Sequence, residues 1–228
     1  MFPGPSLRVR EPDGPPRAVA LVLHGGQARS ERATRPWNGA VVRMVPFARA
    51  LARHDGLVVA RLRYRVRGWN GREQSPVGDT RRALADLRDR FPQLPIALIG
   101  HSMGGRVALT VADEPGVRAI VALAPWIEPH DRVEPVTDRR LFVVHGDRDR
   151  VTDPAASAAF AERARSIAEV SYVSVRGAGH AMVRRARLWH VLAATFAAAA
   201  VLDTSPVGRN DVTHVVERVL AGEASLVV

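Results

Sequence analysis

The chain has 228 residues, 46% hydrophobic and 25% charged, which is typical of a soluble globular protein and long enough to bury one sizeable core. Its formal charge is +10, but every basic residue is an arginine and the arginines are spread along the chain, which argues against the clustered footprint of a nucleic-acid-binding protein. The chain has no cysteine, which excludes a disulfide framework, a thiolate nucleophile and a cysteine-ligated metal.

Two segments of the sequence bear on whether the protein is exported or inserted in a membrane. Residues 1–17 lack the apolar core of a secretory signal peptide. The longest apolar stretch, residues 188–202, is interrupted by His190 and is short for a membrane span, so it is better interpreted as a buried helix. We therefore expect a cytoplasmic protein without a membrane span, folded as a single domain over residues 1–228.

Short apolar runs alternate with segments of helical periodicity along the chain. An apolar run of four to eight residues closed by glycine or proline is typical of a buried parallel strand. Residues 1–16, rich in proline and glycine, are expected to wrap the edge of the domain. Strands are predicted at 18–23, 57–62, 95–99, 117–123, 141–144 and 170–175, and helices at about 40–53, 77–91, 102–112, 154–167, 188–202 and 211–221.

This alternation predicts an α/β protein: a three-layer α/β/α sandwich around a mostly parallel sheet. In such sheets ligands bind at the carboxyl ends of the strands. All the residues considered below as catalytic candidates come directly after a predicted strand, which favours one shared site at that edge.

The segment Gly100-His101-Ser102-Met103-Gly104 lies between a predicted strand and a predicted helix. A G-x-S-x-G sequence in this context is typical of a nucleophile elbow, a sharp turn that exposes the serine hydroxyl above the sheet. Small residues two positions before and after the serine relieve the crowding of the turn. The helix that follows directs the positive end of its dipole at the site. Ser102 is therefore the candidate nucleophile.

A serine hydroxyl needs a base, and the base needs a group that orients it. His180 follows the strand at 170–175 in a glycine-flanked loop and is the best candidate base among the eight histidines. Asp149 follows the strand at 141–144 and is the preferred orienting residue, with Asp147 as second choice. Asp147 is expected to bond the local backbone as a turn residue, and Asp153 to cap the next helix.

A tetrahedral intermediate needs two hydrogen-bond donors. The backbone N–H of Met103, directly after the nucleophile, is one candidate. The other is expected from the turn after the first apolar strand, at Gly26 or Gln27, because glycine lets the backbone approach the substrate.

Four short motifs together resemble the α/β-hydrolase family: HGG at 24–26, GHSMGG at 100–105, HGDRDRV at 145–151 and GAGH at 177–180. The resemblance covers residues 18 to about 202. It implies a catalytic triad of Ser102, Asp149 and His180, in the chain order of that fold, and the oxyanion positions around Gly26 and Met103. Many members insert a helical cap after the strand that ends near Trp126. Here only about a dozen residues separate that strand from the next, so the site is expected to be open and uncapped, as in compact esterases and dienelactone-hydrolase-like members.

The substrate pocket is indicated only weakly. Its candidate residues are Trp37, Trp69, Trp126 and Met182, although for each of them packing is the favoured interpretation. Three loop arginines that could meet a substrate carboxylate, or simply be solvated, are Arg29, Arg65 and Arg67.

These observations predict a serine hydrolase that cleaves a small-molecule carboxylic ester or thioester through an acyl-enzyme, with no metal or organic cofactor. Serine rather than aspartate at position 102 disfavours dehalogenase and epoxide-hydrolase chemistry. Three alternatives stay open: acyl transfer to an alcohol or amine, cleavage of a peptide or carbon–carbon bond by the same triad, and a non-catalytic binding module.

Overall fold

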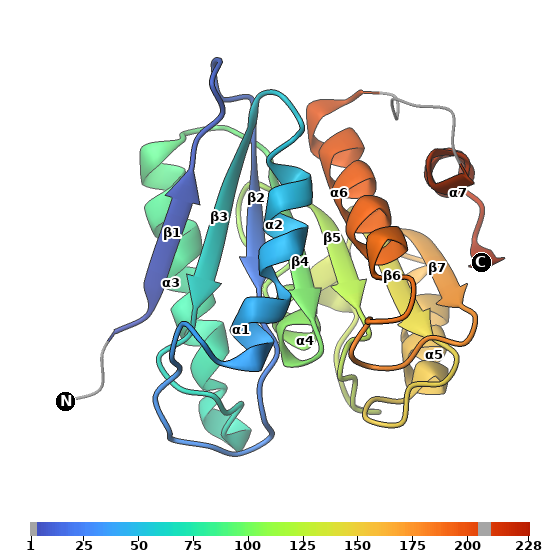
Figure 1. Cartoon of the computed structure of the whole chain (residues 1–228), viewed down its shortest axis with the longest axis horizontal. Helices are drawn as coiled ribbons and strands as arrows, with labels where there is room; N and C mark the ends of the chain where they lie inside the picture. The colour runs from blue at the N-terminus through green and yellow to red at the C-terminus, as the bar shows by residue number, and fades with distance from the viewer. Residues whose placement is uncertain (1–3, 205–210) are drawn as a thin grey trace.

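The computed structural model of the chain describes residues 4–204 and 211–228. Its centre is an eight-stranded sheet with the order β1-β3-β2-β4-β5-β6-β7-β8 (Figure 1). All neighbouring strands are parallel except β1, which pairs with β3 in the antiparallel sense. The strands are β1 Ser6–Arg10, β2 Ala18–Leu23, β3 Leu57–Arg63, β4 Ile96–His101, β5 Val117–Leu123, β6 Arg140–Gly146, β7 Glu169–Val175 and β8 Ser225–Val227.

Helices cover both faces of this sheet, which confirms the predicted three-layer sandwich. One face carries α1 (Gly39–Arg43), α2 (Val45–Leu51), α6 (Ala186–Leu202) and α7 (Asp211–Leu220) (Figure 1). The other face carries α3 (Ser75–Arg90), α4 (Met103–Thr110) and α5 (Pro154–Ala164).

The central strands are continuous apolar runs because they are buried on both sides. In β2, Ala18, Ala20 and Val22 face the core under α2 and α6. The alternate residues Val19 and Leu21 face the core under α3 and α4. A strand of an antiparallel sheet with one solvent-exposed face would instead alternate polar and apolar residues. The continuous apolar run therefore indicates a strand that is buried on both faces.

Two edge strands were not expected from the sequence. Residues 6–10 form β1, whereas the sequence predicted only a wrapping segment, because arginines alternate there with Leu7 and Val9. Residues 225–227 add the short β8 at the opposite edge. The helix predicted at about 40–53 is instead two helices, which divide at Met44, just before Pro46. Proline has no N–H and tends to start a helix rather than continue one.

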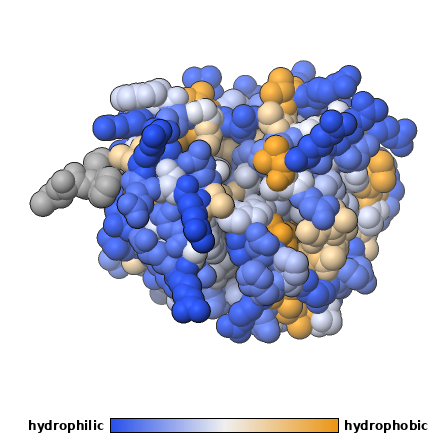
Figure 2. Space-filling view, turned by 90° about the horizontal axis from the view of Figure 1, so that it is seen from below, coloured by the Kyte–Doolittle hydropathy of each residue, from blue (hydrophilic) through white to orange (hydrophobic). Residues whose placement is uncertain are grey.

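The carboxyl ends of the parallel strands lie at the lower edge in Figure 1, and Figure 2 looks onto that edge. Residues 124–139, between β5 and β6, contain only one short 3₁₀ turn, Glu134–Val136, and no cap. The surface there is largely hydrophilic, with separate hydrophobic residues rather than one continuous apolar patch (Figure 2). Among the described residues, no helix is long and apolar enough to cross a bilayer.

Substitution of Phe142 can test the packing of β6 against α6. Its side chain is fully buried and its ring centre lies 4.7 Å from that of Phe196. Phe142→Ala should lower the free energy of unfolding by about 3–5 kcal/mol, since it removes buried contacts and leaves a cavity. The control Val42→Ala, at a position 49% exposed, should change it by less than about 0.5 kcal/mol. Urea denaturation measures both; equal effects would contradict the assignment of Phe142 to the core.

Candidate active site

Ser102 lies at the turn between β4 and α4 with φ 56° and ψ −121°, a backbone conformation that non-glycine residues rarely adopt. Such strain costs on the order of 1–3 kcal/mol and persists only where the surroundings enforce it. Here they do: a Cβ at Gly100 would lie 2.1 Å from the Gly104 carbonyl oxygen, and one at Gly104 would lie 2.5 Å from the Leu23 carbonyl oxygen. The two glycines therefore permit the tight approach that the turn requires.

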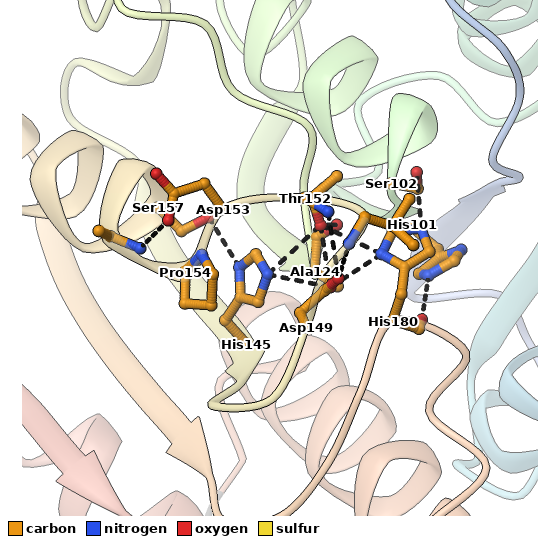
Figure 3. Close-up of polar contacts among 12 residues, drawn as sticks. His101, Ser102, Ala124, His145, Asp149, Thr152, Asp153, Pro154, Ser157 and His180 are labelled. Carbon is orange, nitrogen blue, oxygen red and sulfur yellow. Dashed lines mark hydrogen bonds and ion pairs between the residues drawn. The ribbon is translucent and has the colours of Figure 1, made fainter.

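The structure brings together the three residues predicted from the separate motifs. The Ser102 hydroxyl lies 3.1 Å from Nε2 of His180, and Nδ1 of His180 lies 2.8 Å from Oδ2 of Asp149 (Figure 3). An ionised carboxylate only accepts hydrogen bonds, so Nδ1 of His180 carries the proton and Nε2 accepts from the serine hydroxyl. This is the geometry in which a histidine can act as a base toward serine.

Asp149 is buried but well supplied with hydrogen-bond donors. Oδ1 accepts from the backbone N–H groups of Val151 at 2.8 Å and Thr152 at 3.1 Å. Burial by itself would raise the pKa of Asp149, but these hydrogen bonds and the one from His180 outweigh it and lower that pKa overall. The carboxylate is therefore held in its charged form next to the histidine.

Two further side chains contact this carboxylate that the sequence analysis did not assign to the site. Nε2 of His145 lies 3.1 Å from Oδ2 of Asp149, and Nδ1 of His145 lies 2.8 Å from the Ser157 hydroxyl. The Thr152 hydroxyl lies 2.9 Å from Oδ2 of Asp149 and 3.1 Å from Nδ1 of His180 (Figure 3). In the sequence, His145 directly precedes a glycine at a strand end, a position that predicts no more than a residue bracing a loop. Its position at the end of β6, four residues before Asp149, was the one available signal.

The loop that carries His180 is tied down on two sides. Nε2 of His101 donates to the His180 carbonyl oxygen at 3.0 Å. Asp147 accepts from the N–H of Gly177 at 2.6 Å, so the expectation that it bonds its own local turn is wrong. The contact joins loops thirty residues apart, which sequence spacing cannot reveal. Asp153 does cap α5, accepting from the Ala155 N–H at 2.8 Å, as predicted.

The three backbone N–H groups that the sequence offers as oxyanion donors differ in availability. Met103 is the first residue of α4, and neither its N–H nor that of Gly26 donates to another described residue. Gln27 is excluded, because its N–H donates to the Arg67 carbonyl oxygen at 2.8 Å. Gly26 approaches closely: a Cβ there would lie 2.3 Å from the Met103 methyl carbon.

The pocket candidates lie in different surroundings. Trp37 is 73% exposed, while Met182 is buried in the core under α6 and serves as packing. Trp69 and Trp126 both contact the Arg106 guanidinium, whose carbon is 4.4 and 4.5 Å from their ring centres, and the two rings meet edge to face with centres 6.1 Å apart. The backbone N–H of Trp126 donates to the Ser102 carbonyl oxygen at 3.1 Å, which places Trp126 beside the elbow.

Two of the three loop arginines, Arg65 and Arg67, already bind other groups of the protein. Nε of Arg65 pairs with the buried Asp79 at 2.9 Å, and Nε of Arg67 donates to the Ala33 carbonyl oxygen at 3.2 Å. They are therefore less available to a substrate carboxylate than their loop positions indicated. Within the described part of the chain, no group of three histidine, aspartate or glutamate side chains is placed to hold a metal ion.

The middle of the chain matches a known family in a comparison with family sequence models. Residues 64–142 match the model described as serine aminopeptidase, S33. This segment runs from the end of β3 to β6 and includes the elbow. A search of curated proteins finds no match.

Solved structures match over most of the chain. An α/β serine hydrolase homologue from Coxiella burnetii is 22% identical, with a TM-score of 0.65 over 83% of this chain and 90% of its own. A lid-less α/β serine hydrolase from Xanthomonas campestris is 21% identical, with a TM-score of 0.63 over 83% and 86%. An esterase from Pyrococcus furiosus is 20% identical, with a TM-score of 0.59 over 78% and 81%. The chain thus has the fold of these α/β hydrolases, with no lid between β5 and β6, as its four motifs predicted.

Two buried histidines, His101 and His24, should make the free energy of unfolding depend on pH. Burial lowers the pKa of His101 from 6.5 to about 3 and that of His24 from 6.5 to about 4. Their neutral forms are favoured in the folded state, so the stabilisation is complete above pH 6.5 and is lost as pH falls toward the folded-state pKa values. Each should cost about 1.4 kcal/mol of unfolding free energy per pH unit below 6.5.

Urea denaturation between pH 7 and pH 5 measures this slope. His101→Gln removes one titrating group but keeps a donor for the His180 carbonyl oxygen, so its slope should be shallower than that of the wild type. Identical slopes in the two proteins would show that His101 does not titrate in this window.

Proposed function

We propose that the chain is a serine hydrolase that cleaves a carboxylic ester or thioester through an acyl-enzyme. The observation that carries the proposal is the continuous chain of hydrogen bonds from Ser102 through His180 to Asp149, at the amino end of α4 and the carboxyl ends of the strands. A plain strand–helix turn needs neither a strained serine nor a buried carboxylate behind the facing histidine.

In the acylation step, Ser102 attacks the acyl carbon while Nε2 of His180 takes the hydroxyl proton. The resulting imidazolium is stabilised by Asp149, whose own pKa is already lowered by its hydrogen bonds. His180 then returns the proton to the leaving alcohol or thiol. In deacylation the same histidine takes a proton from the water that attacks the acyl carbon, then gives it to the Ser102 oxygen as the acyl–serine bond breaks and the acid is released.

The negative charge on the intermediate's oxygen needs donors that are already in place. We assign this role to the backbone N–H groups of Met103 and Gly26, both without another partner in the described chain. The dipole of α4 adds a favourable field at the same point. Loss of one such donor typically costs about 3 kcal/mol in the transition state.

An aminopeptidase activity is the second candidate, because residues 64–142 match the serine aminopeptidase model. Such an enzyme needs a free carboxylate for the substrate's α-amino group. Two carboxylates that follow β5 are already engaged: Glu128 accepts from the Trp126 indole at 2.7 Å, and Asp131 holds Arg106 at 2.6 Å. This engagement favours the ester or thioester over the peptide.

The first experiment measures hydrolysis of p-nitrophenyl esters from acetate to long acyl chains, beside aminoacyl p-nitroanilides. We expect ester turnover, with Ser102→Ala reducing it to the buffer rate and Asp149→Asn reducing kcat by about 10⁴-fold, because the histidine loses its correct tautomer. The acyl-chain profile then measures the size of the pocket.

Ser166→Ala, at an exposed position outside the site, is the matched control and should retain full activity. Full ester turnover in Ser102→Ala would contradict the assignment of the nucleophile. Preferential turnover of the anilides would move the function to the peptidase. Failure of a fluorophosphonate to label Ser102 in the folded protein would favour the binding module.

Thr152 is expected to act as a positioning residue in this reaction. Thr152→Val keeps the branched shape but removes the hydroxyl that contacts both Asp149 and His180. We expect kcat to fall about tenfold, the effect of one hydrogen bond to a charged group, with KM unchanged. Thr152→Ser should restore most of the activity, whereas a purely packing role would be disrupted more by serine than by valine.

A further inference from the structure

The edge of the sheet opposite β8 contains a cluster of like charges. Arg8 on β1 lies directly opposite Arg61 on β3, and Ser6 lies directly opposite Arg63. Residues two apart on a strand share a face, so all three arginines lie on one side of the sheet. Like charges directly opposite each other on neighbouring strands destabilise the pair. The fold therefore carries an electrostatic cost at this place.

The described residues do not offset this cost. None of the ion pairs formed by described residues includes Arg8, Arg61 or Arg63. Arg63 donates one hydrogen bond, to the Thr34 carbonyl oxygen at 2.7 Å. Burial lowers the pKa of Arg61, and the nearby charges of Arg8 and Arg49 lower it further. Arg61 thus lies in a local positive field with no carboxylate to balance it.

These three arginines line a cavity of about 90 Å³, which is room for roughly three water molecules. Its lining contains no acidic residue. Val22, Val41 and Met44 supply an apolar wall on the side of α1. His24 also borders the cavity, but both of its ring nitrogens are already hydrogen-bonded. Nδ1 donates to the Gly25 carbonyl oxygen at 2.6 Å and Nε2 accepts from the Tyr64 N–H at 3.2 Å. Apart from the Ser6 hydroxyl, which can also accept, the free polar groups of the cavity are therefore donors.

We propose that this cavity binds a small oxyanion, a carboxylate or a phosphate, through Arg8, Arg61 and Arg63. A guanidinium presents several donors in a fixed plane that matches the geometry of both groups. The volume admits the anionic group with a short apolar tail against Val22 and Met44. Ser102 is not among the residues that line this cavity, and the proposal does not depend on the proposed hydrolysis.

Protection of a sheet edge against aggregation explains only part of the pattern. Edge strands commonly carry charged residues for that purpose, and Arg8 on β1 fits this role. Arg61 and Arg63, however, lie on β3, which is paired on both sides, with β1 and with β2. Both also line the partly open cavity rather than the free edge of the sheet, which favours a bound anion as the group that balances their charges.

The test compares thermal unfolding of the purified chain in inorganic phosphate, in butyrate and in chloride at equal ionic strength. A ligand that binds only the folded state raises Tm in a saturable way. We expect saturable stabilisation by phosphate or butyrate in the wild type. Arg61→Gln should need a concentration about ten- to a hundredfold higher for half the effect, because a charge-assisted hydrogen bond is lost. The anion that stabilises at the lower concentration identifies the ligand class.

Arg72→Gln is the control, because it removes one exposed positive charge outside the cavity. It should respond to both anions like the wild type. Phosphate also stabilises proteins non-specifically by exclusion from their surface. An equal response of wild type, Arg61→Gln and Arg72→Gln would therefore overturn the proposal, as would the absence of any stabilisation beyond chloride. A variant that unfolds can be replaced by Arg8→Gln, which removes the opposite charge from the more exposed strand.

Discussion

The sharp turn at Ser102 is the constraint on which the rest of the site depends. The turn that gives Ser102 a positive φ leaves almost no room for side chains two positions before and after it. Gly100 and Gly104, which have no side chain, fit at these two positions. The turn can form only where a buried strand ends and a helix begins. The parallel sheet supplies that place, and also the neighbouring strand ends from which Asp149 and His180 reach the same point.

Asp149 receives hydrogen bonds from more groups than a histidine partner alone requires. His180, His145 and Thr152 all contact its carboxylate, and two backbone N–H groups complete its surroundings. A buried charge is tolerable only when such partners replace water. The loop between β6 and α5 therefore acts as a single unit that keeps the carboxylate charged and the His180 ring in one orientation.

The arginine content acquires meaning only in three dimensions. Along the chain the arginines are scattered, and composition gives no reason to prefer one over another. In the fold, Arg65 and Arg106 are neutralised by Asp79 and Asp131, whereas Arg8, Arg61 and Arg63 face one cavity without a carboxylate. The difference between structural arginines and arginines left to meet an anion depends on pairing across strands, which no local pattern encodes.

The sequence by itself determined the alternation of strands and helices and the positions of the three candidate catalytic residues. Both can be predicted because buried strands appear as short apolar runs and tight turns as glycine-containing segments. Only the tertiary structure decided which groups surround them. The N–H of Gln27 is occupied by Arg67, Asp147 reaches Gly177, and Thr152 lies between Asp149 and His180. β1 and β8 were not predicted either, because a strand at the edge of a sheet needs no continuous apolar run. Contacts between distant segments depend on how the strands are ordered in the sheet, and that order is a property of the whole chain.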